Sequence, residues 1–539
     1  MNVKRIINSS LVGLAVLFTF VSAQDPEPGG VYRMVSAYDM TTLDPAQAGN
    51  FEDWWSSGLV LFQHLYQYDA QGKLFPEVAA DFPTISDDGL VYTISIRQGV
   101  MFANGRELVA EDVAYTLERV LTPTTLSWGP AGLYVIDGAE DFYGGEAETI
   151  SGINVIDDYT IEFTLNQPSY TFPDLMASSV YGIVPKQETM DAGASWGTEV
   201  LIGSGPFMLT EFLPGDKVVY AKNPHYYQEG LPYLDGIEIA LNVPQSVAAL
   251  RVENGEADFA PADALPGAVL AQIQSDPEYA ETGRRGVSGV ITIITLNPAS
   301  EPLQDVRVRQ AVALAMDRES IMRRSGRGVP HDSLYPSPYP QFNPDFKTNY
   351  AYDLEAAKAL MTEAGYGPDN PITGYSIFAG QGQEMGEIMQ ADLKEIGIEA
   401  EVLTGNFSDF EEQFWDGEIF LTHFGAAGSF FDAAEMIRGR YLCLSDAEKA
   451  AAKDPRANNT RWCDERIDEM FARAQTLRTD DPERTQLFRD IENMIINENV
   501  WIVVPYASQA LALSQANIVG DDLHPLYTLP TLEDAWIDQ

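Results

Sequence analysis

The residue types that usually carry catalysis occur in this sequence, but their spacing matches no metal-binding or redox motif. H-E-x-x-H and C-x-x-C patterns are absent from the sequence, and G-x-S-x-G occurs once, at residues 193–197. The acid pairs Asp87-Asp88 and Asp157-Asp158, which could act as general acid and base, fall where turns are expected. We therefore expect a binding protein with no metal ion and no cofactor. A secreted hydrolase is the competing class, and turnover of a peptide or glycoside would reveal it. The five histidines form no local cluster and stand at positions 64, 225, 331, 423 and 524.

Cys443 and Cys463 are the two cysteines of the chain. An even number of cysteines in an exported protein favours a disulfide bond. Closing a loop of roughly twenty residues would stabilise the fold by about 3 kcal/mol. Because the two cysteines lack C-x-x-C spacing, we predict a structural bridge rather than a redox site.

The N-terminal 23 residues have the pattern of a signal peptide. Lys4 and Arg5 precede an apolar run over residues 11–20, and Val21-Ser22-Ala23 fits a cleavage site of small residues. The run is too short for a membrane span, and no later segment is long and apolar enough for one. No cysteine near the cut could carry a lipid anchor. We expect cleavage near Ala23 and an exported, periplasmic protein.

Length and charge narrow the classes of partner. A chain of 539 residues exceeds what one core normally holds, so two or three domains are expected. The formal net charge of −47 argues against nucleic acid as a partner. A solvated acidic surface explains this charge, and so does attraction of cationic ligands; the sequence leaves both open.

The clearest local pattern lies in residues 90–120. Alternation over residues 91–96 predicts a half-buried strand, and Asn104-Gly105 predicts a tight turn. Residues 110–120 predict a helix with an apolar stripe. Its first turn contains Glu111-Asp112, where the helix dipole favours anions. Helices that alternate with strands later in the chain indicate an α/β protein.

This order of strand, R-x-G-V-x-F, N-G and A-E-D-V resembles the signature of the bacterial extracellular solute-binding proteins, family 5. These are the peptide- and oligopeptide-binding components of ABC importers. Two positions differ from the usual pattern, with Asn104 in place of Asp and Val109 in place of Thr. Further motifs extend the resemblance over almost the whole mature chain. They are Leu43-Asp44-Pro45, Gly203-Ser204-Gly205-Pro206-Phe207 and D-V-R-V-R-Q-A within residues 303–321.

The resemblance implies an α/β, periplasmic-binding-protein type II fold. Two lobes surround a ligand cleft, and a third small domain is inserted in the first lobe. Hinge closure over the ligand would produce the signal that the importer recognises. The implied protein is a monomer whose partners are its ligand and the permease subunits of an ABC importer in the inner membrane. The expected boundaries are 24–66, 198–284 and 505–539 for the first lobe, 67–197 for the small domain, and 285–504 for the second lobe.

In peptide-binding relatives, the segment after L-D-P lines the cleft. By this carry-over, Gly49, Asn50 and Phe51 face the ligand. Trp54 follows on the same segment, where packing within a helix explains it equally well. Trp128 lies in a loop whose counterpart approaches the ligand, although burial at the surface is an equal explanation.

A second cleft segment, residues 423–432, departs most from the family. Peptide-binding relatives have G-W-x-x-D-Y here, and its Asp pairs with the amino terminus of the peptide. The best alignment puts Ser429 at that position, so the amine anchor is missing unless Asp432 replaces it. An ordinary structural role is the competing explanation for His423. The candidate ligand residues of this segment are His423, Phe424, Ser429, Phe430 and Asp432.

Two ligand classes therefore remain for the same fold. The first is a peptide or oligopeptide, which the resemblance implies. The alternative is a neutral oligosaccharide or another non-peptide solute, which the loss of the acid at Ser429 suggests.

Overall fold

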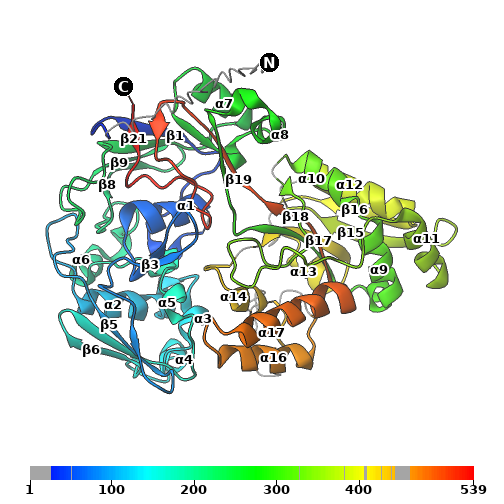
Figure 1. Cartoon of the computed structure of the whole chain (residues 1–539), viewed down its shortest axis with the longest axis horizontal. Helices are drawn as coiled ribbons and strands as arrows, with labels where there is room; N and C mark the ends of the chain where they lie inside the picture. Colours follow the sequence, from blue (N-terminus) through cyan, green and yellow to red (C-terminus); the bar gives the residue numbers. More distant parts are fainter. Residues whose placement is uncertain are drawn as a thin grey trace, which may run out of the picture.

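The chain folds into two lobes, each built around one large mixed sheet (Figure 1). This computed structural model describes residues 26–538, apart from residues 50, 327, 381–382, 406–408, 427, 439 and 444–461. The predicted signal peptide lies outside the described residues. Within the described ranges, no helix is long and apolar enough to cross a membrane.

The first lobe is centred on a seven-stranded sheet whose strands come from distant parts of the chain. Its order is β12-β19-β11-β1-β10-β9-β8, so β19 lies between β11 and β12. Strand β1 pairs in parallel with β10 and β11, and the other neighbours are antiparallel. The strands are β1 (Val31–Val35), β8 (Phe207–Leu213), β9 (Lys217–Lys222), β10 (Gly236–Ala240), β11 (Phe259–Pro261), β12 (Gly283–Gly286) and β19 (Ala510–Ser514).

The second lobe contains a six-stranded sheet of order β14-β18-β13-β17-β15-β16. All residues of β13 are buried, as expected of a strand covered on both faces. Helices α9 (Val306–Ala315), α11 (Leu354–Glu363) and α12 (Gln383–Glu395) pack against this sheet. The strands are β13 (Ile291–Leu296), β14 (Gly328–Val329), β15 (Ile372–Phe378), β16 (Ile398–Leu403), β17 (Ile419–Ala426) and β18 (Ile502–Ser508).

A smaller sheet of order β4-β5-β7-β6 packs against helix α2 (Ala110–Val120). The strand, turn and helix predicted in this region are all present, and Gly105 adopts φ +82° at the turn. Only a residue that tolerates positive φ suits this place, which explains the N-G pair. The strands are β4 (Thr84–Ile85), β5 (Val91–Ser95), β6 (Ile153–Asp157) and β7 (Thr160–Thr164).

Asp112, in the first turn of α2, binds several parts of this region together through hydrogen bonds. Arg106 donates to both carboxylate oxygens of Asp112, at 3.0 and 2.8 Å. The backbone N–H groups of Val109 and Lys186 donate to the same carboxylate at 3.1 and 2.9 Å. These donors satisfy a side chain that is 1% exposed, and they join the turn, the helix start and a later segment. The A-E-D-V motif is thereby explained by folding rather than by ligand binding.

Within the described residues, two short connections join the lobes. Residues 287–290 link β12 to β13, and Gln509 links β18 to β19. Figure 1 shows β18 and β19 running between the two lobes. The boundaries expected near residues 284 and 504 lie beside these connections, although β18 continues in the second sheet to Ser508. The division into domains at those residues stays a prediction.

The predicted disulfide bond between Cys443 and Cys463 is present, with Cα atoms 4.9 Å apart. The backbone N–H of Cys443 also donates to Asp468 Oδ1, at 3.0 Å, in helix α16 (Glu465–Gln475). The bridge therefore fastens the segment that follows helix α14 (Ala433–Arg438) to the start of α16. Residues 444–461, inside the bridged loop, lie outside the described part of the chain.

Candidate functional site

Two tryptophan side chains converge on the backbone next to Gly49. The indole N–H of Trp54 donates to the carbonyl of Ala48 at 2.8 Å, and that of Trp128 donates to the carbonyl of Gln47 at 3.2 Å. A Cβ on Gly49 would lie 3.8 Å from the indole nitrogen of Trp128. The structure therefore brings three of the predicted ligand residues together, and we call Gly49, Trp54 and Trp128 the aromatic rim.

The structure does not describe the side chains of the other two predicted residues of this segment. Asn50 lies outside the described residues, and Phe51 is described only as the first residue of helix α1 (Phe51–Trp55). Their assignment to the ligand stays a prediction.

The loop that carries Trp128 is strained and exposed. Leu126 adopts φ +54°, a left-handed conformation that costs about 1–2 kcal/mol for a residue with a Cβ. Its side chain is 78% exposed, and that of Trp128 is 49% exposed. Tyr181 fixes the loop, because its hydroxyl donates a hydrogen bond to the carbonyl of Gly129 at 2.8 Å. Strain together with exposed apolar groups is typical of a binding loop.

On the second lobe, strand β17 carries two of the predicted residues. The ring of Phe424 packs against Phe378 at 5.6 Å between centroids, so part of this side chain belongs to the core. Burial lowers the pKa of His423 to about 4, which keeps its imidazole neutral at physiological pH. Its Nε2 atom is buried and has no hydrogen-bond partner in the described residues. His423 therefore supplies a neutral polar group near the C-terminal end of strand β17.

Asp432, the predicted substitute for the amine anchor, is already paired. Arg484 of helix α17 (Pro482–Asn493) donates to both of its carboxylate oxygens, each at 2.7 Å. Gln341 Nε2 donates at 2.9 Å, and the backbone N–H of Ala434 donates at 2.9 Å. With the residue 3% exposed, these donors neutralise and enclose the carboxylate. The arrangement opposes a direct role for Asp432 toward a ligand. Of its predicted neighbours, Ser429 is exposed and Phe430 is buried.

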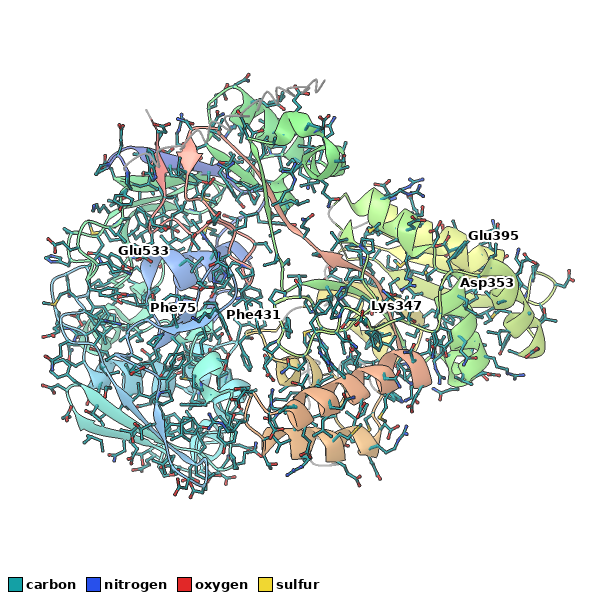
Figure 2. The ribbon with its side chains drawn as sticks, viewed as in Figure 1. Phe75, Lys347, Asp353, Glu395, Phe431 and Glu533 are labelled. Carbon is teal, nitrogen blue, oxygen red and sulfur yellow. A yellow bond between two sulfur atoms is a disulfide. The ribbon has the colours of Figure 1, made fainter. Side chains whose placement is uncertain are left out.

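Sequence reasoning missed Phe431, which joins the two lobes. Figure 2 shows this side chain between them. Its ring lies 4.9 Å from that of Tyr68 in strand β2 (Tyr66–Tyr68) and 5.7 Å from that of Tyr339, centroid to centroid. Gly289, in one of the two connections, could not carry a Cβ, which would lie 2.5 Å from the Phe431 ring. An adjacent Phe-Phe pair in a segment expected to face the cleft was the available signal.

A polar contact lies beside Phe431, on the side of the first lobe. The hydroxyl of Tyr68 donates to Asp174 Oδ1 at 2.7 Å, in the short helix α5 (Phe172–Leu175). Burial and the nearby charge of Asp432 raise the pKa of Asp174 to about 7, against the effects of the Tyr68 hydroxyl and Arg484. We call Tyr68, Asp174 and Phe431, with the Asp432–Arg484 pair, the interlobe contact.

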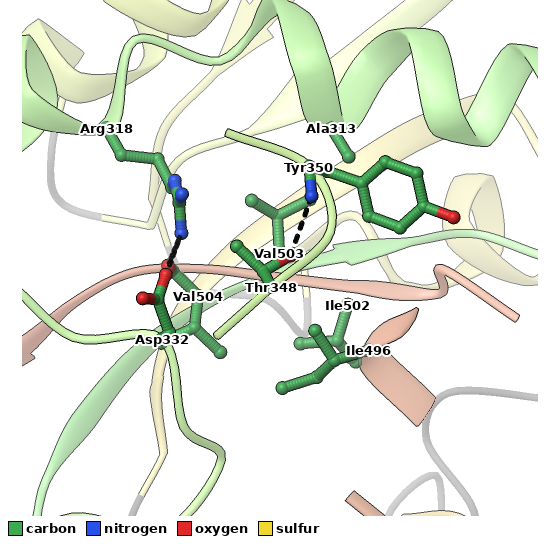
Figure 3. Close-up of a pocket in the computed structure, with 9 residues that line it drawn as sticks. All are labelled: Ala313, Arg318, Asp332, Thr348, Tyr350, Ile496, Ile502, Val503 and Val504. Atoms are coloured by element: carbon green, nitrogen blue, oxygen red, sulfur yellow. Dashed lines mark hydrogen bonds and ion pairs between the residues drawn. The ribbon is translucent and has the colours of Figure 1, made fainter. Parts of the chain in front are cut away.

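A small cavity within the second lobe is unsuited to a peptide. It is lined by residues from strand β18 and its neighbours, with the Arg318–Asp332 ion pair at 2.8 Å on one side (Figure 3). Its volume of about 10 Å³ is room for one water molecule at most. Among the described residues, no cluster of His, Cys, Asp and Glu could hold a metal ion. The aromatic rim and the second-lobe segment after β17 are thus the stronger candidates for a ligand surface.

The sequence and the fold were compared with those of known proteins. The family model "Bacterial extracellular solute-binding proteins, family 5 Middle" matches residues 73–446. Di/tripeptide-binding protein 2 of Pseudomonas aeruginosa is 26% identical over 492 residues, covering 85% of this chain and 87% of the relative. Heme-binding protein A of Haemophilus influenzae is 25% identical over 472 residues, covering 84% and 82%.

A solved structure supports the fold independently. It is the periplasmic binding protein DppA of Helicobacter pylori in complex with the peptide STSA, with a TM-score of 0.78. The match covers 95% of this chain and 99% of that chain. Because the identity is 21%, the match supports the fold alone. The predicted type II fold with two lobes is confirmed. With most of its length matched by the family model, this chain belongs to the bacterial extracellular solute-binding proteins, family 5.

Proposed function

We propose that this protein captures short peptides outside the inner membrane and delivers them to an ABC importer. The names of its relatives support this ligand class, because di/tripeptide-binding protein 2 is similar over most of both chains. The observation that carries the proposal is the pair of short connections, at residues 287–290 and at Gln509, between two lobes whose aromatic rings Tyr68 and Phe431 meet. Such a layout suits hinge closure around a ligand.

The aromatic rim and the segment after β17 are the proposed ligand surfaces. Trp54 and Trp128 would contact the side chains of the peptide, since indole rings supply large apolar area while their N–H groups stay bonded to the backbone. The exposed Ser429 would offer a neutral hydroxyl to the peptide backbone. A surface of rings and small polar groups recognises a peptide by its backbone and tolerates varied side chains.

Export and assembly follow from the same proposal. We infer that residues 1–23 direct export and are removed near Ala23, and that the mature protein acts as a periplasmic monomer. Its macromolecular partners would be the permease subunits of the importer. Mass determination of the exported protein tests the cleavage, and light scattering tests the monomer.

Thermal unfolding against ligand panels tests the proposed function. The mature protein, residues 24–539, would be heated with di-, tri- and tetrapeptides and, separately, with neutral oligosaccharides. A ligand at a hundred times its Kd should add about 2.7 kcal/mol to the free energy of unfolding. Stabilisation by peptides, with the peptide recovered intact, supports a binding protein. Stabilisation by sugars with silent peptides, or hydrolysis of the peptide, contradicts the proposal.

A further inference from the structure

The ring of Phe431 fills a socket whose walls come from the first lobe and from a connection between the lobes. Two walls are Tyr68, 4.9 Å away between ring centroids, and Gly72, in the turn that follows strand β2. The third wall is Gly289, whose backbone N–H donates to the carbonyl of Pro525 at 2.9 Å. Because Phe431 is 3% exposed, the socket and the second lobe together enclose almost the whole ring.

The socket exists because two of its walls lack a Cβ. A Cβ on Gly289 would lie 2.5 Å from Cε1 of the Phe431 ring, and a Cβ on Gly72 would lie 3.4 Å from Cε2. The first distance is well below the roughly 3.5–4.0 Å of a favourable contact between carbon atoms. The ring can therefore occupy this place only while residue 289 is a glycine.

Phe431 is fixed to the second lobe by its neighbours. The next residue, Asp432, is held by its buried ion pair, and Tyr339 packs edge-on against the ring at 5.7 Å between centroids. One buried apolar cluster contains Phe431 and extends from Tyr66 on the first-lobe side to Phe488 in α17. Separation of the lobes would divide this cluster and expose the ring to water, which the hydrophobic effect opposes.

We propose that the Phe431 ring and its socket form a latch, which holds the two lobes in contact before a ligand arrives. The latch goes beyond the proposed function because it concerns the lobes alone, and only its effect on affinity rests on peptide binding. A protein whose binding-competent arrangement is populated in part binds every ligand more weakly by that fraction. Loss of the latch should therefore weaken all ligands by one common factor. Loss of a direct contact would affect some ligands more than others.

Two substitutions open the latch by different routes. Phe431→Ala removes the ring, and Gly289→Ala fills the socket but leaves the ring and its segment unchanged. The control for an added Cβ is Gly144→Ala, after helix α4 (Ala139–Tyr143), where the Cβ would lie 3.4 Å from its nearest neighbour. The control for a lost ring is Phe346→Ala, a partly buried phenylalanine of the second lobe outside the interlobe contact.

Electron paramagnetic resonance on spin-labelled protein measures the separation of the lobes without ligand. The labels would be attached through Glu118→Cys in α2 and Asp490→Cys in α17, two exposed positions on helices at opposite sides of the interlobe contact (Figure 1). We expect a longer and broader distribution of distances when Phe431→Ala or Gly289→Ala is added. Both controls should keep the original distribution.

Calorimetric titration of the unlabelled proteins with Ala-Ala, Ala-Ala-Ala and Ala-Ala-Ala-Ala measures the effect on affinity. Each latch variant should weaken all three peptides by the same factor, about fivefold or more, and each control should change them by less than about twofold. The double variant should behave like Phe431→Ala alone, because a Cβ at residue 289 clashes only while the ring is present.

Unchanged distances in both latch variants overturn the proposal. Losses of affinity that differ among the peptides overturn it as well, because they would show that Phe431 contacts the ligand, and so do multiplicative losses in the double variant. If Phe431→Ala does not fold, Gly289→Ala and its control decide the question. Failure of the unmodified protein to bind any peptide overturns the proposed function instead, while the distances still test the latch.

Discussion

Asp432 and Glu435 stand three residues apart on one short segment at the start of helix α14, and they differ in their hydrogen-bond partners. Asp432 points into the second lobe, where Arg484 binds both of its oxygens at 2.7 Å. The carboxylate of Glu435 forms no hydrogen bond or ion pair with a residue that the structure describes, although its charge raises the pKa of Arg438 against the effect of burial. The difference shows that the role of an acid beside the ligand surface depends on its partners. Its position in a motif is not sufficient.

Removing the charge of Asp432 should have the largest effect on stability. The substitution Asp432→Asn leaves the guanidinium of Arg484, whose side chain is 2% exposed, without its counter-charge. We expect a loss of about 3–5 kcal/mol in the free energy of unfolding, measured by urea denaturation. Glu483→Gln is the control, because its ion pair with Arg473 is half exposed and contributes at most about 1 kcal/mol. Equal effects of the two substitutions would show that the buried pair is not structural.

Opening the disulfide bond should have the next largest effect, because it frees the end of the segment that carries both acids. Cys443 and Cys463 are separated by 20 positions. Replacing both by serine should lower the free energy of unfolding by about 3 kcal/mol. Urea denaturation of the double variant, with the reduced unmodified protein in parallel, checks this. A midpoint that does not move in either sample contradicts the prediction.

The interlobe contact should make stability depend on pH through Asp174. Its pKa is raised from 3.8 to about 7, so the folded protein retains a proton that the unfolded chain releases. The contribution is fully present below pH 3.8 and is lost as the pH rises through 7. Because the side chain is partly exposed, we expect Asp174→Asn to remove about 1–2 kcal/mol of the decrease between pH 5 and pH 8.

This pH effect is measured as the difference between the two proteins in urea denaturation at pH 5 and pH 8. Tyr68, Asp432 and Arg484 face Asp174 and remain in both proteins, as do other buried acids. Parallel pH curves for the two proteins would show that Asp174 does not titrate in this range.

Glu435→Gln should have the smallest effect on stability and therefore sharpens the comparison with Asp432. Glu435 forms no described hydrogen bond or ion pair, and it acts on Arg438 only at longer range, so the free energy of unfolding should change by less than about 0.5 kcal/mol. Urea denaturation in the absence of ligand measures it. A loss above about 2 kcal/mol would mean that Glu435, like Asp432, has a structural role.

Patterns within a few neighbouring residues predicted local structure well. Alternation over residues 91–96 predicted β5, and the apolar stripe over residues 110–120 predicted α2. Such signals depend on backbone geometry over one or two turns. The family motifs added the type II fold with its two lobes.

The contacts that decide the roles of the acids could not be predicted in the same way. Arg484 is 52 positions from Asp432, and no local pattern links them. Tyr68 and Phe431 meet across the lobes from distant parts of the chain. Only the packed structure shows which charges are already neutralised.

The place of β19 in the first sheet has a consequence for the order of folding. Strand β12 pairs only with β19 among the described strands, and β14 pairs only with β18. Neither sheet can therefore be completed before residues 502–514, which come late in the chain, have joined it. Contacts of such long sequence separation slow folding, since loop closure must precede them. A chain that ends before residue 502 would lose an inner strand from each lobe at once, so neither lobe could fold to completion ahead of the other.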